Sequence, residues 1–277
     1  MPAATINLTT LNTSPAITQE QLINTISSLF VSDLGFTLID SYTDTNIIYR
    51  VLSHQYTSAL KDTAYLRLSI TTNTNVMSLS LFDSWNTTTK NGTNGINTTT
   101  TATISIDNGQ VFSFRTVNHP EIKGVLITQG NTYYGFHGLI RPANIPTWWD
   151  LNNHLFAFMP ELGRPSTGSL TVNILANNPT GLFTTTSNAF TNPQHILVNP
   201  DLLNTNVNSS SREMLKGIVI ANAGGNFGII CKTSNDLALV GGLNLSPGGS
   251  LAIIEGVNEY TFLGHSYASP YLAVKSI

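Results

Sequence analysis

The spacing of apolar residues changes once along the chain, near residue 35. Before this point, apolar side chains recur every three or four residues, as on one face of a helix, at Leu22, Ile23, Ile26, Leu29 and Phe30. Thr18 and Gln21 precede this run at the spacing of a capping box, and Gly35 follows it as a stop signal. The pattern predicts one amphipathic helix over residues 19–32.

After residue 35 the apolar residues follow a period of two, which is typical of β-strands. Segments 46–52, 64–70 and 76–82 each predict a strand, and the polar turn 71–75 predicts a hairpin between the last two. With the helix over one face, these strands form a small α+β module. Residues 86–101, NTTTKNGTNGINTTTT, cannot form a core, so we expect a long flexible loop there, or an arm that becomes ordered against a neighbour.

The strand pattern continues in the second half of the chain. Segments 102–106, 110–114, 124–128 and 132–136 predict an antiparallel meander, because the turns between them contain the Asn and Gly that positive φ requires. A proline-rich stretch, 141–150, leads to predicted strands at 154–159 and 169–175. Residues 176–212 are polar and predict a linker or an extended loop, and short apolar runs at 213–277 predict a small sandwich or barrel.

These patterns together define the expected fold class. The protein is predicted to be mainly β, with antiparallel sheets or a sandwich, a small α+β N-terminal module and one clear helix. Three modules are expected: 1–101, ending in the Asn- and Thr-rich loop; 102–212, a β-rich middle module with a linker; and 213–277, a small β-sandwich or barrel.

The composition of the chain argues against several classes of function. Only 10% of the residues are charged, against about 25% in ordinary soluble proteins. The net charge of −3 offers no excess of Lys and Arg to replace the counterions of nucleic acid. Residues 1–5 carry no basic region of a signal peptide, and no run approaches the ~20 apolar residues of a membrane span. We therefore expect no nucleic-acid partner, no membrane span and no export signal.

The residues that could perform chemistry are scattered. Cys231 is the only cysteine and lies in an apolar run, which favours a buried, inert thiol. The glycine-rich segment 221–228 resembles a phosphate-binding loop, but a strand-like run follows it instead of a helix, so we interpret it as a hairpin turn. The six histidines show no metal-ligand spacing. No metal, cofactor or catalytic residue is predicted.

Aromatic pairs mark the candidate binding residues, which are Tyr133, Tyr134, Trp148 and Trp149. Trp148 and Trp149 lie in the proline-rich stretch, where we favour packing in the core or at an interface over stacking on a sugar ring. Asp150 and Glu161 are the best pair of carboxylates for glycoside hydrolysis, although nothing in their spacing specifies that reaction.

Three motifs carry a resemblance to a known group of proteins. They are Ala64-Tyr-Leu-Arg-Leu, Asp83-Ser-Trp-Asn-Thr-Thr and Gly135-Phe-His-Gly-Leu-Ile-Arg-Pro. At these positions the chain resembles the β-rich virion structural proteins of tailed bacteriophages, namely tail, baseplate or neck subunits. The resemblance covers residues 35–160. It implies assembly with copies of itself and with other virion proteins, as a trimer, hexamer or larger ring, without a cofactor.

The sequence is compatible with three hypotheses of function. The first is a structural subunit of a tailed-phage virion, made in the host cytoplasm and held in the particle by β-strand and loop contacts, without enzymatic activity. The alternative is a carbohydrate-binding host-recognition adhesin, which would bind a surface glycan through the aromatic pairs, or a capsid decoration protein. A depolymerase is the third possibility, which the scattered acidic residues support least.

Overall fold

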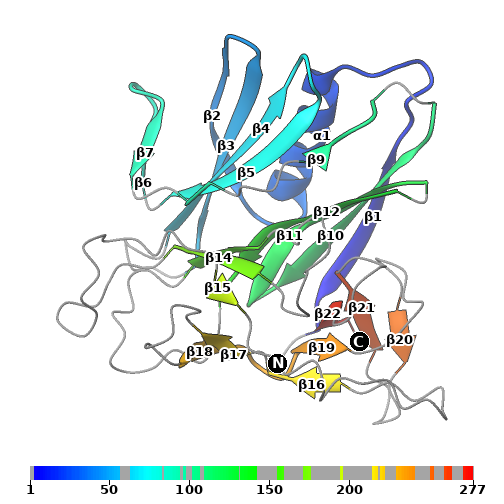
Figure 1. The fold of residues 1–277 in the computed structure, drawn as a ribbon, viewed down its shortest axis with the longest axis vertical. Helices are drawn as coiled ribbons and strands as arrows, with labels where there is room; N and C mark the ends of the chain where they lie inside the picture. The colour runs from blue at the N-terminus through cyan, green and yellow to red at the C-terminus, as the bar shows by residue number, and fades with distance from the viewer. Residues whose placement is uncertain are drawn as a thin grey trace.

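The computed structural model describes most residues up to 141 and shorter stretches beyond. The described ranges are 3–56, 63–82, 84–93, 96–97, 102–106, 109–130, 132–141, 155–158, 171–175, 194–195, 214–217, 219–221, 229–240, 250–252, 259–263 and 271–276. The fold is mainly β, with antiparallel sheets and one helix near the N-terminus, which confirms the predicted fold class (Figure 1).

Helix α1 (Gln19–Ser32) has the bounds that the sequence predicts. The Thr18 side chain accepts from the Gln21 backbone N–H at 3.1 Å, and the Gln21 side chain accepts from the Thr18 N–H at 2.8 Å, so the capping box is complete. The chain leaves the helix at Asp33 and turns at Gly35, where φ is +73°. Within the described part of the chain, no helix is long and apolar enough to cross a membrane.

The first sheet has the strand order β2-β3-β4-β5-β8 and is antiparallel throughout. It contains β2 (Thr37–Asp44), β3 (Ile47–Gln55), β4 (Thr63–Thr71), β5 (Val76–Phe82) and β8 (Ile96–Asn97), and β9 (Ala102–Thr103) also pairs with β5. The hairpin of β4 and β5 confirms the predicted one. Alternate residues of β4 are buried, as their period of two requires.

The second sheet has the order β1-β10-β11-β12-β13-β14-β15. Its strands are β1 (Thr5–Leu11), β10 (Phe112–His119), β11 (Ile122–Gln129), β12 (Thr132–Ile140), β13 (Leu155–Phe158), β14 (Thr171–Leu175) and β15 (Gln194–His195). The meander β10-β11-β12 confirms the last three strands of the predicted meander. Its predicted first strand, 102–106, is wrong, because β9 in this segment pairs with β5 of the first sheet. β1 adds an N-terminal strand beside β10, which the sequence pattern did not predict.

Helix α1 packs against both sheets. It contacts β2, β3 and β4 of the first sheet and β10 and β11 of the second. One core joins the apolar face of the helix, including Phe30, to inward residues of both sheets such as Leu66 and Phe114. The core therefore includes residues from both sides of position 101, while the division into three modules stays a prediction.

Polar contacts fix the end of α1 to the second sheet. The Asp33 carboxylate accepts from Thr116 Oγ1 at 2.8 Å and from Asn7 Nδ2 at 3.1 Å. Burial alone would raise the pKa of Asp33, but hydrogen bonds from Ser32, Thr116 and Asn7 outweigh it and lower this pKa below 3.8. The Asn7 contact holds β1 against the helix.

Strands β11 and β12 approach each other closely at a pair of glycines. Gly124 and Gly138 lie opposite each other in the register. A Cβ atom on Gly124 would lie 2.5 Å from the His137 carbonyl oxygen, and one on Gly138 would lie 2.4 Å from the Lys123 carbonyl oxygen. The Phe136 ring lies over both positions and fills the space that two side chains would otherwise take. Glycine is therefore required at both positions.

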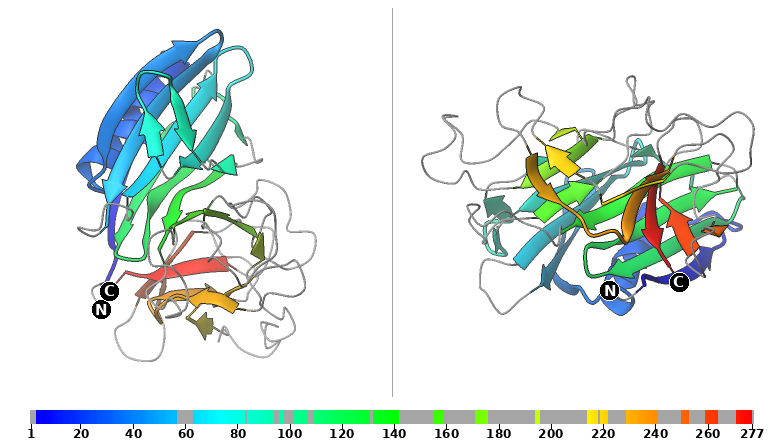
Figure 2. Two further views of the ribbon diagram at one scale, coloured as in Figure 1. Left: turned by 90° about the vertical axis from the view of Figure 1, so that its left-hand side faces the viewer. Right: turned by 90° about the horizontal axis from the view of Figure 1, so that it is seen from below.

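The C-terminal strands form two further antiparallel sheets. One has the order β16-β19-β22-β21-β20, and the other pairs β17 with β18. The strands are β16 (Met214–Lys216), β17 (Val219–Ala221), β18 (Ile229–Lys232), β19 (Leu237–Val240), β20 (Ser250–Ala252), β21 (Glu259–Phe262) and β22 (Tyr271–Lys275). The Ala4 N–H donates to the Lys275 carbonyl at 2.7 Å, so the two ends of the chain lie side by side (Figure 2).

Candidate functional site

Most of the candidate residues lie in the part of the chain that the structure does not describe. Trp148, Trp149, Asp150 and Glu161 lie outside the described residues, and so does the side chain of Tyr133. Their roles in packing, sugar stacking or catalysis stay predictions.

Tyr134 is the one aromatic candidate whose side chain is described. It is only 5% exposed and belongs to the central core. Its hydroxyl donates to Gln129 Oε1 at 2.9 Å and accepts from the Ser105 backbone N–H at 3.3 Å. Tyr134 therefore contributes to internal packing, and its ring offers no stacking surface to solvent.

The described histidines lie apart from one another. His54 Nδ1 pairs with the Gly35 carbonyl at 2.9 Å, while His119 and His137 are buried in the second sheet. Among the residues that the structure describes, no three His, Cys, Asp or Glu side chains are grouped as metal ligands. The other three histidines have side chains outside the described residues: His154, His195 and His265.

The strand pairing around Cys231 agrees with the predicted hairpin, while the burial of its thiol stays a prediction. Cys231 lies in β18, although its side chain is outside the described residues. The glycine-rich residues 222–228 are also outside them, but β17 and β18 on either side pair antiparallel. Antiparallel pairing across a short connection is the geometry of the predicted hairpin.

Ionisable side chains meet where the C-terminal sheet contacts the second sheet. The Glu121 carboxylate accepts from the Ser234 backbone N–H at 2.9 Å and from the Ser234 hydroxyl. His119 Nε2 lies 3.5 Å from Asp236 Oδ2. Burial lowers the pKa of His119, and the nearby Glu121 and Asp236 charges offset this only in part. A serine, a histidine and two acids thus gather here. Their contacts join the turn after β10 to the loop before β19, and we call this group the junction.

Replacing Glu121 with alanine is expected to lower the free energy of unfolding by about 3 kcal/mol, because it leaves buried Ser234 donors without their charged acceptor. Chemical denaturation measures this loss. Asp44→Ala is a suitable control, because Asp44 is exposed at the end of β2 and exposed charges contribute little to stability. An equal effect of both substitutions would contradict the assigned role of the junction.

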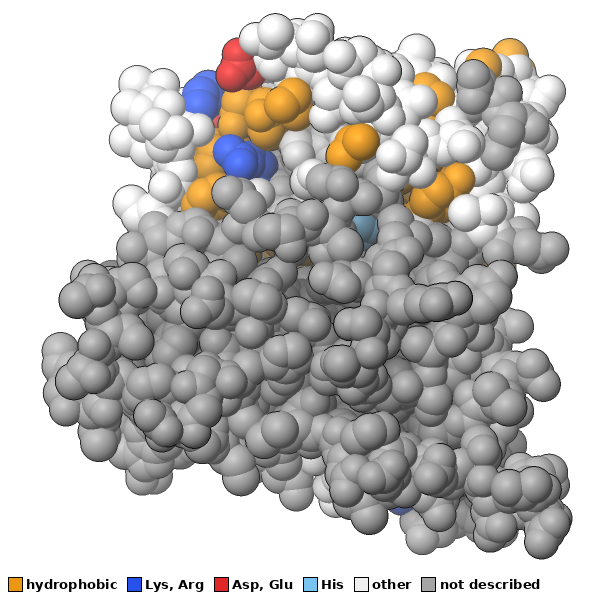
Figure 3. Space-filling view, viewed as in Figure 1, with side chains coloured by type: hydrophobic (Ala, Val, Ile, Leu, Met, Phe, Trp, Pro, Cys, Tyr) orange, Lys and Arg blue, Asp and Glu red, His pale blue; other side chains and the backbone are white. Residues whose placement is uncertain are grey.

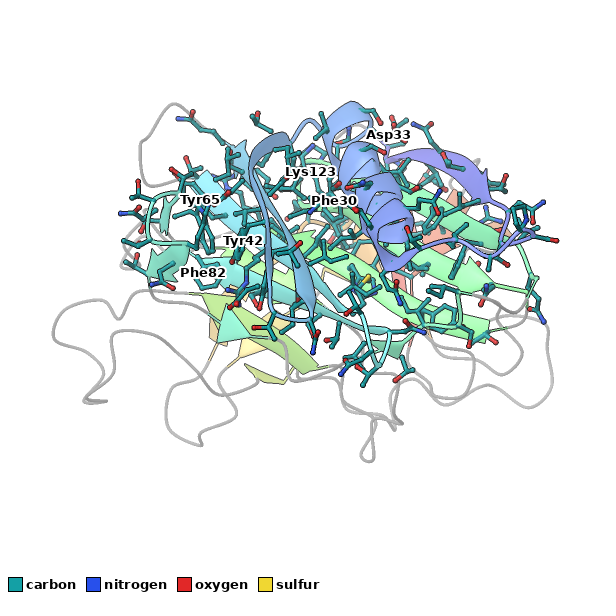
Figure 4. All side chains as sticks on the ribbon, turned by 90° about the horizontal axis from the view of Figure 1, so that it is seen from above. Phe30, Asp33, Tyr42, Tyr65, Phe82 and Lys123 are labelled. Atoms are coloured by element: carbon teal, nitrogen blue, oxygen red, sulfur yellow. The ribbon has the colours of Figure 1, made fainter. Side chains whose placement is uncertain are left out.

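The most concentrated group of aromatic and charged side chains lies on the outer face of the first sheet, away from α1. We call this surface the aromatic face, and it consists of Asp40, Tyr42, Tyr49, Arg67, Phe82, Trp85 and Lys90. Hydrophobic side chains gather there around Lys and Arg side chains (Figure 3), and Tyr42 and Phe82 lie on the opposite side of the sheet from Phe30 of the helix (Figure 4).

The strand register assembles the aromatic face. Tyr42 of β2 lies opposite Tyr49 of β3, and their rings stack with centroids 4.6 Å apart. The Trp85 ring lies 6.3 Å from that of Tyr42 and 5.4 Å from that of Phe82. Cross-strand aromatic pairs of this kind stabilise a sheet, so four rings from separate segments form one continuous group.

Arg67 of β4 lies at the centre of this group. Its guanidinium carbon is 5.1 Å from the ring centroids of Tyr49 and Phe82 and 5.9 Å from that of Trp85. These distances are within the range of cation–π attraction. Arg67 is partly buried, and among the described residues its Nε finds no hydrogen-bond partner. The rings therefore supply much of the environment of this cation.

Asp40 is the negative charge of the aromatic face. Its carboxylate accepts from Lys90 Nζ at 2.6 Å and from Trp85 Nε1 at 2.9 Å. Burial alone would raise the pKa of Asp40, but these hydrogen bonds, the Lys90 charge and the Ser41 N–H outweigh it and hold this pKa below 3.8. Asp40 thus fixes the orientation of both side chains that come from outside the sheet.

Trp85 and Lys90 belong to a hairpin. The expectation of a flexible loop is therefore wrong for residues 86–93. The hairpin consists of β6 (Ser84–Asn86) and β7 (Asn91–Thr93). The Asn86 side chain accepts from the backbone N–H groups of Thr88 and Thr89, an Asx turn that replaces the missing apolar contacts. Gly92 lies directly over the Phe82 ring, where a Cβ atom would approach to 2.3 Å.

The arrangement favours a protein contact over sugar stacking. A sugar needs a free ring face, but Tyr42 is engaged by Tyr49 and Lys90, and Tyr49 also by Arg67. Tyr, Trp and Arg are also the residues enriched at the centres of protein interfaces. The sequence pattern does not reveal this site, because its members come from five strands, β2 to β6, and from the turn after β6. The alternation of polar and apolar residues in β4 was the one available signal, since it places Arg67 on the outer face.

Comparison with models of known protein families gives no match, and comparison with curated proteins gives none either. The fold and the site place the chain in the broad class of mainly β proteins with antiparallel sheets and one packed helix.

Proposed function

We propose that this protein is a structural subunit of a tailed-phage virion, in the tail, baseplate or neck region, without a catalytic role. In this proposal, contacts with copies of itself and with other virion proteins hold it in the particle. The observation that carries the proposal is the aromatic face, in which Trp85, Tyr42 and Arg67 combine on one partly exposed surface. Such a combination is typical of binding hot spots between proteins.

Two of the three motifs that resemble phage proteins meet at this surface. Arg67 belongs to the motif at 64–68 and Trp85 to the motif at 83–88, and the Arg67 guanidinium carbon lies 5.9 Å from the Trp85 ring centroid. The two motifs are therefore parts of one spatial unit. This supports a shared role for them in assembly.

The charges of the described residues support the same proposal. Asp40 and Glu121 are held by hydrogen bonds in buried positions. Both carboxylates therefore contribute to the fold through these bonds. With only 10% charged residues, the surface can meet neighbours without burying unpaired charge.

Mass spectrometry of purified virions tests the location. The chain is expected among the particle proteins in a fixed ratio to the other structural subunits. Its absence from intact particles would exclude the virion role, even if the chain were abundant in infected cells.

Trp85→Ala is expected to reduce incorporation into particles by at least about tenfold, because hot-spot tryptophans contribute more than about 2 kcal/mol to an interface. The ratio of this chain to a major virion protein measures the effect. Val31→Ala is the control, since Val31 is an exposed hydrophobic residue of helix α1, on the other side of the first sheet from the aromatic face. Thermal unfolding of both variants separates lost binding from lost folding. Equal incorporation of the two variants, both folded, would contradict the proposal.

The adhesin alternative gives a different result in a glycan array. If the protein is an adhesin, the wild type should bind a surface glycan on the array. Trp85→Ala, or a double Trp148→Ala and Trp149→Ala variant, should then lose that binding. A structural or capsid-decoration subunit gives no glycan signal in any of these proteins.

A further inference from the structure

Strand β1 is an exposed edge of the second sheet. It ends the strand order and pairs only with β10 among the described strands, in a continuous register over seven residues without a bulge (Figure 1). Its residues, Thr5-Ile-Asn-Leu-Thr-Thr-Leu11, include no charge and no proline. An edge strand turns alternate N–H and C=O groups outward, where they can pair with another strand.

Strand β2, at one edge of the first sheet, has features that prevent pairing with another chain, and β1 lacks them. Strand β2 has a bulge between Leu38 and Asp40, and it carries a second acid at Asp44. Bulges and charges are the usual means by which edge strands avoid other chains. β1 has neither, although the two strands are of similar length. The contrast within one molecule singles out β1 as the edge open to pairing.

The position of Leu8 indicates which strand could pair with this edge. Leu8 is the central residue of β1, and at 57% exposure it is the most exposed large hydrophobic residue among those described. If two β1 strands pair antiparallel about a two-fold axis at this position, Leu8 of each copy faces Leu8 of the other. Asn7 then lies opposite Thr9, and Ile6 opposite Thr10. The strand sequence is thus compatible with itself in this register.

We propose that β1 pairs antiparallel with β1 of a second copy of this chain, with the two-fold axis at Leu8. The pairing joins two second sheets into one continuous sheet and covers both Leu8 side chains. Because β1 is uncharged, no like charges face each other across the two β1 strands. The nearest charge in the register is Arg115 of β10, one strand away from the contact. A two-fold contact uses each edge once, so it closes as a dimer instead of growing further.

This inference deepens the proposed assembly function and rests on it, but it involves a different surface from the aromatic face. The mass of the purified chain, measured by light scattering over a concentration series, is expected to approach twice 29.9 kDa. Leu8→Lys places like charges opposite each other and beside Arg115 of β10, so self-association is expected to weaken more than about 100-fold. Leu8→Glu should weaken it less, because Arg115 of the same copy lies opposite position 8 and offsets part of the added charge. Mixing these two variants is expected to restore a dimer, because opposite charges then face each other.

Leu38→Lys is the matched control, since Leu38 is an exposed leucine on the other edge strand, and it should leave the dimer unchanged. Circular dichroism verifies that each variant is folded. A monomeric wild type, or a dimer that Leu8→Lys leaves intact, would overturn the inference. A Leu8→Lys variant that stays monomeric alone and in the mixture with Leu8→Glu would reject this register. Trp85→Ala should not change the dimer, so failure of the strand pairing and failure of the aromatic-face contact give separate results.

Discussion

Gly124→Ala and Gly138→Ala are each expected to lower the free energy of unfolding by about 3 kcal/mol, because inserting a methyl group into a closely packed site forces atoms apart. The atoms nearest to the added Cβ are backbone carbonyl oxygens, at 2.5 Å for Gly124 and 2.4 Å for Gly138. Paired backbone cannot move aside as a flexible side chain can. Chemical denaturation of the purified variants measures the loss.

Two further variants identify the cause of this loss. Gly109→Ala is expected to cost only about 1 kcal/mol, because its positive φ of +70° strains an alanine but no atom lies within 4 Å of the added Cβ. Adding Phe136→Leu to Gly124→Ala should not restore stability, because the clash with the His137 carbonyl persists. Recovery in that double variant would show that the ring, and not the backbone, limits the space.

Acidification from pH 6.5 to 4 is expected to remove about 3 kcal/mol of stability through His137 alone, at about 1.4 kcal/mol per unit of pKa change. Burial lowers the pKa of His137 from 6.5 to about 4. The unfolded chain therefore binds the proton first as the pH falls, so this contribution is complete above pH 6.5 and lost by about pH 4. Burial of His119 lowers its pKa and acts in the same direction. Denaturation midpoints at several pH values measure the slope.

His137→Gln separates this residue from the other titrating groups. Glutamine does not titrate, and it retains a donor for the Tyr134 carbonyl, which lies 3.2 Å from His137 Nε2. The variant should lose less stability than the wild type between pH 6.5 and 4. The lowered pKa values of Asp33 and Asp40 act only at lower pH, below about 3.8. Identical pH profiles for wild type and variant would contradict the assignment.

The elements with strong local patterns were predictable. Helix α1 combines a capping box with apolar residues on one face, and both signals lie within 15 consecutive residues. The hairpin of β4 and β5 alternates clearly because one face is buried and the other is not. In such segments local preference and tertiary structure agree, so a reading of neighbouring residues is enough.

The elements that the sequence missed depend on distant partners. β1 is mostly polar, and it becomes a strand because β10 offers it a paired backbone and Asp33 binds Asn7. β2 is an edge strand with a bulge, which breaks the period of two. The hairpin at 84–93 depends on an Asx turn and on contacts with Asp40 and Phe82, which outweigh a composition typical of loops.

By itself, the sequence determined the local elements of this protein, namely one capped helix, a series of antiparallel strands and a surface poor in charge. Only the tertiary structure decided which distant residues meet: Asp40 with Lys90, Arg67 with Trp85, and Glu121 with Ser234. The physical reason is the distance along the chain over which each interaction acts. Periodicity and capping act between residues a few positions apart, whereas strand register and burial bring together side chains that no local pattern relates.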